Sequence, residues 1–206
     1  GSSSIVSGFD NYIGYVDPVF EILEGGADNS GILAGVGNLI KYQGVESSIS
    51  SGQANVIARS NRSCIGSGYK NSITSYADFS TAENSISSGA FNSIHTNGTE
   101  VKRNFIGAGN ENKITSYAES TLDALDNMIG AGDDNFILGG IGSIIGAGAD
   151  NKIWSPVPDY ASNYSLIGSG TGNMIAFSPF SLICGGSSNV IKINQTAAIS
   201  LGLPQA

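Results

Sequence analysis

One phrase recurs eleven times in this chain of 206 residues: an isoleucine-led stretch that is closed by Gly-x-x-Asn. Residues 68–71 (Gly-Tyr-Lys-Asn) and 132–135 (Gly-Asp-Asp-Asn) are two of the copies. Ten of the eleven copies continue as Asn-x-Ile, and the copy that ends at Asn29 does not. A repeat of this kind constrains the architecture before any local propensity does, and a repeated motif indicates scaffold more often than an active site.

The spacing of the repeat asparagines indicates which kind of repeat this is. Apart from the irregular copy, consecutive asparagines are 16 to 23 residues apart, and the extra residues follow Asn-x-Ile. Helical repeats need about 33 residues or more, whereas two short strands and two turns fit into 16. We therefore predict an all-β fold, a parallel β-solenoid of about eleven short coils. We expect the solenoid to span residues 5–193, with a tag remnant or linker at 1–4 and a tail or cap at 194–206.

Alternation along each strand predicts which side chains point inward. Isoleucine should stack on isoleucine along the axis, and the repeat asparagines should stack on one another and hydrogen-bond from coil to coil. We read this asparagine ladder as structural. It comprises Asn11, Asn38, Asn55, Asn71, Asn92, Asn112, Asn135, Asn151, Asn173 and Asn189.

The outward position just before the first isoleucine of each coil changes along the chain. It is polar or small in the first half and apolar in the second half, where it reads Phe105, Met128, Ile144, Leu166 and Leu182. An apolar outward row needs a cover, since a thin solenoid has little core of its own. We favour a homotrimer with this row as the oligomer interface, and the alternative is cover by the insertion loops.

Composition limits the classes of partner and the compartment. The net charge is −8, which argues against nucleic acid or an anionic membrane as the partner. No apolar stretch approaches the 18 residues of a transmembrane helix. Cys64 and Cys184 are six repeats apart, too far for a disulfide. The polar, glycine-rich composition is typical of a virion or extracellular cell-surface protein.

Three apparent catalytic or ligand signals have simpler explanations. Residues 130–135 resemble a dinucleotide fingerprint, but the phrase recurs along the solenoid and no helix pattern follows it. Turns such as 150–151 (Asp-Asn) suggest calcium but lack the tandem nonapeptide of calcium-binding β-rolls. His95, the only histidine, is expected to be a solvated loop residue at a strand end. We therefore predict no cofactor, no metal site and no catalytic residue.

The insertions between coils are the better place to look for a ligand site. Residues 73–78 and 114–119 are near copies, and 154–160 occupies the same place two coils further on. Aromatic rings suit the apolar faces of sugars, and nearby carboxylates accept hydrogen bonds from sugar hydroxyls. We predict glycan contact, with edge capping as the structural alternative. The candidate residues are Tyr76, Asp78, Tyr117, Glu119, Trp154, Asp159, Tyr160 and Tyr164.

The repeats also resemble a known class of surface protein. Residues 84–89 (Asn-Ser-Ile-Ser-Ser-Gly) and 127–132 (Asn-Met-Ile-Gly-Ala-Gly) are similar to the head repeats of trimeric autotransporter adhesins of the YadA type, and to repeats of bacteriophage tail fibres and tailspikes. The resemblance covers about residues 5–191. It implies a trimer that attaches a virion or a cell to a host surface, often through glycans. The chain differs from the YadA-type head in its 16-residue minimum spacing and its long insertions.

Three functions follow from these observations. The first is a non-enzymatic structural or attachment module of a phage tail fibre or bacterial surface adhesin, which binds a host-surface glycan or receptor through edge loops. The second is a polysaccharide-degrading β-helix, with paired acids such as Asp123 and Asp126 or Glu119 and Asp159. The third is a spacer shaft without a ligand.

Overall fold

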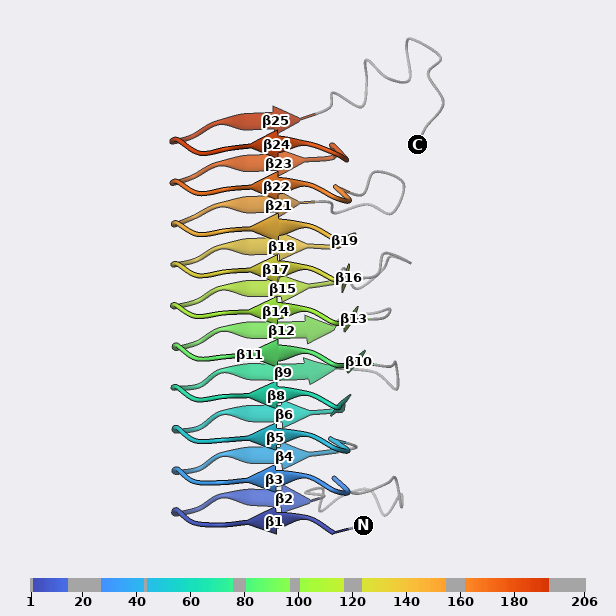
Figure 1. Cartoon of the computed structure of the whole chain (residues 1–206), viewed down its shortest axis with the longest axis vertical. Coiled ribbons are helices and arrows are strands. Elements are labelled where there is room, and N and C mark those ends of the chain that lie inside the picture. The colour runs from blue at the N-terminus through green and yellow to red at the C-terminus, as the bar shows by residue number, and fades with distance from the viewer. Residues whose placement is uncertain are drawn as a thin grey trace, which may run out of the picture.

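The computed structural model is a parallel β-solenoid, which confirms the predicted fold class (Figure 1). It describes residues 2–14, 27–42, 44–75, 81–96, 101–116, 124–154 and 162–192, with only the backbone of residues 81, 82 and 96. These residues form 25 strands and no helix. β1 and β25 lie at opposite ends of the stack (Figure 1).

Two long sheets run along the axis, each with one strand from every coil, and all pairings are parallel. The first sheet consists of β1 (Ser4–Ile5), β3 (Gly31–Ile32), β5 (Ser48–Ile49), β8 (Cys64–Ile65), β11 (Ser85–Ile86), β14 (Phe105–Ile106), β17 (Met128–Ile129), β20 (Ile144–Ile145), β22 (Leu166–Ile167) and β24 (Leu182–Ile183). The second consists of β2 (Tyr12–Gly14), β4 (Leu39–Lys41), β6 (Val56–Ala58), β9 (Ser72–Ser75), β12 (Ser93–Thr96), β15 (Lys113–Thr115), β18 (Phe136–Leu138), β21 (Lys152–Trp154), β23 (Met174–Ala176) and β25 (Val190–Lys192).

A third, short sheet covers part of the remaining side. It contains β7 (Ser60–Asn61), β10 (Thr81–Ala82), β13 (Val101–Lys102), β16 (Ala124–Leu125) and β19 (Gly140–Ile141). In the other coils, the described residues on this side form turns instead of strands.

The described residues make ten coils where the repeat count suggested about eleven, because each long sheet has ten strands. The difference comes from the irregular copy at Asn29. Asn29 lies in the turn that leads into β3, and the amide of Glu46 in the next coil donates to the carbonyl of the adjacent Asp28. This copy therefore occupies the opposite end of the coil from the other ten.

The core is two columns of isoleucine, one behind each long sheet. Ile65 and Ile73 of one coil are fully buried, and so are their equivalents through most of the stack. The register pairs each isoleucine with the isoleucine of the next coil, for example Ile137 with Ile153. A β-branched side chain fits this pleated, fully buried position well.

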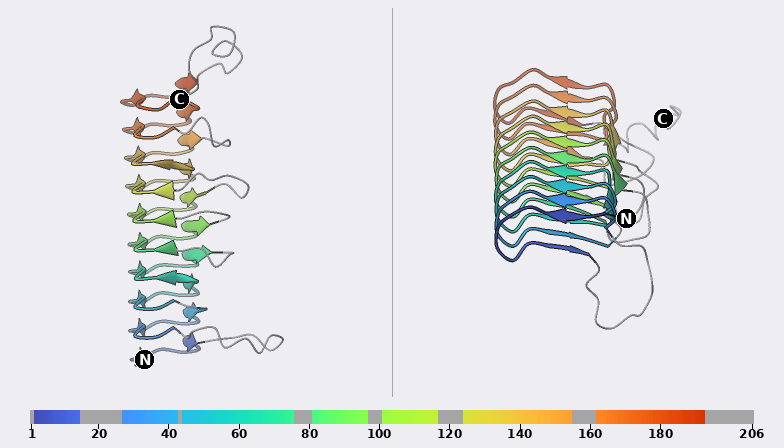
Figure 2. Two further views of the ribbon diagram at one scale, coloured as in Figure 1. Left: turned by 90° about the vertical axis from the view of Figure 1, so that its right-hand side faces the viewer. Right: turned by 60° about the horizontal axis from the view of Figure 1, so that its bottom comes forward.

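Each coil turns at two places, which we call the tip edge and the corner edge. The tip edge is the Gly-x-x-Asn turn from the first sheet to the second, where single β-bridges continue from Phe9 to Ser187. The corner edge is the connection from the second sheet to the first sheet of the next coil. The tip edge repeats almost identically from coil to coil (Figure 2). The strands of the third sheet lie at the corner edge, on the right in Figure 1.

Candidate functional site at the corner edge

The repeat asparagines form a continuous ladder along the tip edge. The side-chain amide of Asn112 shares its hydrogens among Asn92 Oδ1, Ala108 O and Gly132 O, at 3.1, 3.0 and 2.8 Å. Its backbone amide also donates to Asn92 Oδ1, and its own Oδ1 accepts from Asn135. The copies from Asn38 to Asn173 repeat this pattern. Since the side-chain donors and acceptors of these copies are used within the ladder, they stabilise the stack rather than bind a ligand.

The glycine of the tip turn is required by both conformation and space. Gly109 has a φ of 107°, and a Cβ at this position would overlap the carbonyl oxygen of Gly132 in the next coil. The backbones of successive coils therefore approach one another closely here. The dinucleotide-like phrase at 130–135 is one of these turns, so its glycines serve coil stacking.

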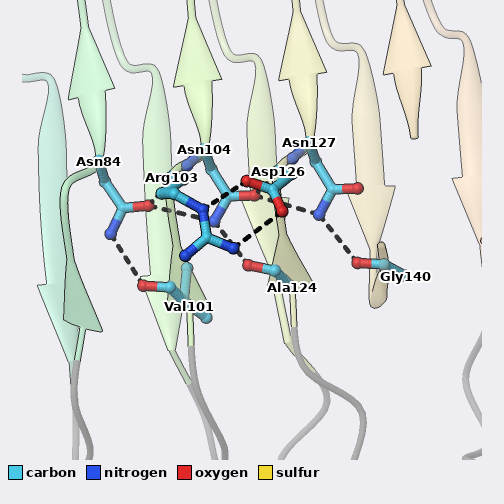
Figure 3. A network of polar contacts seen from close by, with 8 residues as sticks. All are labelled: Asn84, Val101, Arg103, Asn104, Ala124, Asp126, Asn127 and Gly140. Carbon is cyan, nitrogen blue, oxygen red and sulfur yellow. Dashed lines mark hydrogen bonds and ion pairs between the residues drawn. The ribbon is translucent and has the colours of Figure 1, made fainter. Parts of the chain in front are cut away.

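A second polar ladder runs along the corner edge, and the sequence analysis did not identify it. Asn104 donates from its backbone and side-chain amides to Asn84 Oδ1, and from its side chain to Ala124 O at 2.7 Å (Figure 3). Ser143 does the same with a hydroxyl: its amide donates to Asn127 Oδ1 and its Oγ to Ser162 O. The signal was present in the sequence, because the residue two before the first isoleucine of each coil is always Ser or Asn.

Outside this second ladder lies a column of residues in the left-handed conformation, with φ between 49° and 65°. We call it the corner column, and it reads Asn29, Glu46, Arg62, Glu83, Arg103, Asp126, Gly142, Tyr164 and Phe180. Its charges alternate from Glu46 to Asp126. Arg62 forms an ion pair with Glu83 at 3.0 Å, and Arg103 is bidentate to Asp126 at 2.6 and 2.9 Å (Figure 3). After Asp126 the column continues with Gly142 and then with the aromatic residues Tyr164 and Phe180.

The ion pair of Asp126 bears on the enzymatic alternative. The hydrogen bond from Arg103 lowers the pKa of the Asp126 carboxyl; partial burial raises this pKa by less, and the positive charge of Arg103 lowers it a little further. A lowered pKa is the reverse of what a general acid needs. Its suggested partner Asp123 lies outside the described residues, as do Glu119 and Asp159.

Acidic residues gather at the tip edge in the second half. Partial burial raises the pKa of Asp134, and the hydrogen bond with Asp150 and its negative charge raise it further. Nearby, Asn110 donates to Asp133 at 3.0 Å. Within the described ranges, no group of three or more His, Cys, Asp or Glu side chains has an arrangement that could hold a metal ion.

Aromatic residues meet in two pairs at the corner edge of the last coils, and we call these four residues the aromatic corner. Tyr164 stacks on Phe180 with ring centroids 5.5 Å apart and an interplanar angle of 16°. Trp154 contacts Phe177 at 5.9 Å. Tyr164 and Phe180 are 57% and 77% exposed, Trp154 is 36% exposed, and Phe177 is buried. Two predicted ligand residues, Trp154 and Tyr164, thus lie here together with Phe177 and Phe180, which sequence analysis missed.

The other predicted ligand residues, Tyr76, Asp78, Tyr117, Glu119, Asp159 and Tyr160, lie outside the described residues.

The predicted oligomer interface lies within the described residues. Phe105, Met128 and Ile144 are half-buried on the outer face of the first sheet, and Leu166 and Leu182 are exposed there. The register aligns all five in one column. We call this column the apolar row.

The expectation for His95 is wrong. His95 lies within β12, pairs in register with Thr74, and its Nδ1 is 2.7 Å from Thr74 Oγ1. The strand continues past Ile94 because the chain at this coil has no tight turn there, so the imidazole lies partly buried on the sheet surface.

Comparison with known protein families and with curated proteins gives no match for this chain. Among the described residues, no helix has the length and apolar character needed to cross a membrane.

Proposed function

We propose that this chain is a non-enzymatic attachment module of a phage tail fibre or bacterial surface adhesin, which binds a host-surface glycan. The aromatic corner carries the proposal. Phe180 is 77% exposed, although a solvent-exposed phenylalanine stabilises neither the core nor the ladders. The likeness of the repeats to YadA-type heads and phage fibres agrees with this proposal.

The aromatic corner suits a sugar ring for physical reasons. Tyr164 and Phe180 come from successive coils and are held in place by backbone hydrogen bonds, from Tyr164 N to Ile141 O and from Phe180 N to Asn163 O. A rigid aromatic surface loses little entropy when a ligand stacks on it. The phenol of Tyr164 adds a polar group that can hydrogen-bond a sugar hydroxyl.

Assembly into a homotrimer is the second part of the proposal, with the apolar row as the interface. The row continues towards the aromatic corner, because Leu166 and Leu182 follow Tyr164 and Phe180 by two residues each. The row itself is apolar over five successive coils, and aromatic residues adjoin it in the last two, while the equivalent positions in earlier coils include Gly31, Ser48 and Ser85. Exposed apolar surface of this extent is typical of an interaction site.

A glycan array tests the binding function. We expect the intact chain to bind a subset of host-type glycans and Phe180→Ala to weaken that binding by about tenfold, since stacking on one aromatic ring contributes on the order of 1 kcal/mol or more. Phe91→Ala is the matched control, because Phe91 is also an exposed aromatic residue in a left-handed turn but lies at the tip edge. A blank array would favour the spacer shaft, and loss of polymer chain length would indicate the depolymerase.

Sedimentation equilibrium on the same preparations tests the assembly. A trimer mass that falls to the monomer mass in the double variant Ile144→Ser with Leu166→Ser would support the apolar row as the interface. Cys64→Ser, at the same register in the first half, is the control. A monomeric intact chain would overturn the trimer.

A further inference from the structure

A second candidate site lies at the corner edge, several coils before the aromatic corner. It is a cavity of about 300 Å³ lined by Lys41, Tyr42, Ala58, Arg59, Thr74, Ser75 and His95. This volume is at the lower end of the range of volumes of small-molecule binding sites. Its lining comes from β4, β6, β9 and β12, so the cavity spans four successive coils of the second sheet.

The cavity arises where the corner edge changes its form. Tyr42 and Arg59 follow their strands in the left-handed conformation, with φ of 48° and 53°, and turn the chain at once. In the next coils β9 and β12 run on to Ser75 and Thr96. Ala58 lies in register between Lys41 and Thr74, and its methyl group leaves room that a longer side chain would fill.

Among the described residues, the charged groups that line the cavity are both positive. The chain has nine Lys and Arg residues against seventeen Asp and Glu. Two of the nine, Lys41 and Arg59, lie here, and none of the seven described lining residues is acidic. In a protein with a net charge of −8, this concentration of positive charge favours an anionic ligand.

The cationic groups are also positioned. Lys41 Nζ lies 5.0 Å and the Arg59 guanidinium carbon 5.4 Å from the ring centroid of Tyr42, so one ring orients both. The backbone amide of Arg59 donates to Tyr42 O at 2.7 Å, which fixes the start of its side chain. The 2.7 Å contact between Thr74 Oγ1 and His95 Nδ1 fixes the opposite wall.

We infer that this cavity binds the carboxylate or sulfate group of an acidic saccharide. Lys41 and Arg59 supply charge-assisted hydrogen bonds, with the planar guanidinium matched to an oxyanion. Thr74 and His95 supply further hydrogen-bonding groups for hydroxyls of the same or the next sugar. The cavity extends about 14 Å from the coil of Lys41 to that of His95, at about 4.8 Å for each coil, so it takes an oligosaccharide segment rather than a lone ion. The inference rests on the proposed attachment function and adds the charge class of its ligand.

Isothermal titration calorimetry of the full chain with three hexasaccharides tests this inference. The probes are a heparin hexasaccharide with sulfate and carboxylate groups, a heparosan hexasaccharide with carboxylate groups alone, and neutral cellohexaose. We expect at least one acidic probe to bind, and Lys41→Ala and Arg59→Ala each to weaken it by about tenfold or more, since each removes a charge-assisted hydrogen bond. Which acidic probe binds distinguishes sulfate from carboxylate as the recognised group.

Lys192→Ala is the matched control variant. Lys192 occupies the same register column as Lys41, and its Nζ lies 5.7 Å from the ring centroid of Phe177. It is not among the residues that line the cavity. We expect it to change the affinity for the acidic probe by less than about twofold, as for an isolated surface charge. Equal losses in all three variants would mean diffuse attraction and would overturn the inference.

The two proposals fail in different ways. If neither acidic probe binds while the array shows neutral glycans that depend on Phe180, the inference about the cavity is wrong and the attachment function stands. If the acidic probe binds and requires Lys41 and Arg59 while Phe180→Ala has no effect, the cavity is the site and the aromatic corner is not. If no glycan of either kind binds, both proposals fail.

Discussion

The tip edge and the corner edge both turn the chain and connect successive coils, but the corner edge tolerates more variation in sequence. Both turn the chain, and both carry a ladder of polar side chains that connects the coils. At the tip edge the ladder is asparagine in all ten coils and the turn always begins with a left-handed glycine. At the corner edge the ladder alternates between runs of serine and asparagine, and the turn varies in length and conformation.

This difference indicates where a solenoid can acquire a ligand site. The tip edge uses its polar groups and its space for stacking, so a change there affects two neighbouring coils. At the corner edge, either serine or asparagine can make the hydrogen bonds of the ladder. The residues of the corner column, which lie outside this ladder, can therefore vary. The alternating charges, the aromatic corner and the cationic cavity all lie at the corner edge.

A pair of glycines gives the largest predicted contrast between the edges. We expect Gly109→Ala to cost about 3 kcal/mol or more, because it combines a φ of 107° with overlap of the next coil's carbonyl. Gly142→Ala should cost less, about 1–2 kcal/mol, since its φ of 65° is close to that of Glu83 in the same column and its Cβ would meet only the side-chain ring of Tyr164, at 2.8 Å, and no backbone. Chemical unfolding followed by circular dichroism measures both. A similar loss of unfolding free energy in both variants would contradict the proposed difference between the two edges.

The two ladders give the next contrast, with the same substitution in each. We expect Asn112→Ser to cost about 2–4 kcal/mol, because it removes the side-chain hydrogen bonds to Ala108 O and Gly132 O and the amide oxygen that accepts from Asn135 N. Gly132 O keeps only its bond from the backbone amide of Asn110. Asn104→Ser should cost about 1 kcal/mol, since serine already occupies this register in seven of the ten coils. Hydrogen exchange at the neighbouring coils checks where protection is lost. A larger loss from Asn104→Ser would show that the corner ladder is the stricter one.

Two exposed aspartates, one at each edge, give the smallest contrast. Ionised Asp126 stabilises the fold, whereas ionised Asp134 destabilises it. Asp126 has a lowered pKa in the fold, so its ion pair with Arg103 stabilises the protein above the ordinary aspartate pKa and is lost as the pH falls through the lowered value. Asp134 has a raised pKa, so its ionised form destabilises the fold at neutral pH, and this cost disappears as the pH falls below the raised value.

At neutral pH we therefore expect Asp126→Asn to cost about 0.2–1 kcal/mol, less in high salt. Asp134→Asn should stabilise the protein by up to about 0.5 kcal/mol. Both differences should vanish in thermal melts at acidic pH. A stabilising Asp126→Asn would mean that the alternating charges of the corner column do not support the stack.

The repeat was sufficient to predict the solenoid, its inward isoleucines and the position of the apolar row, because strict periodicity determines register. It gave one coil too many, since the copy at Asn29 has the letters of a tip turn but lies at the corner edge. The serine and asparagine positions of the second ladder were visible in the sequence as a fixed offset from isoleucine. This ladder is harder to recognise than the first because serine and asparagine share the same position.

The cationic cavity was not predictable in the same way. Lys41, Arg59 and His95 come from three coils, and no fixed spacing relates them. Their proximity depends on the left-handed turns after Lys41 and Ala58, which the sequence alone does not specify. The same holds for Phe180, which meets Tyr164 only because their two turns stack in register.

The in-register stacking of the coils has a consequence for evolution and design. Because successive coils pair in the same register in both long sheets, insertion or deletion of a whole coil between the cavity and the aromatic corner would preserve the pairing on either side. Each insertion would separate the two places by a further step of about 4.8 Å. Under the proposed attachment function, the number of intervening coils would set the length of ligand that can reach both.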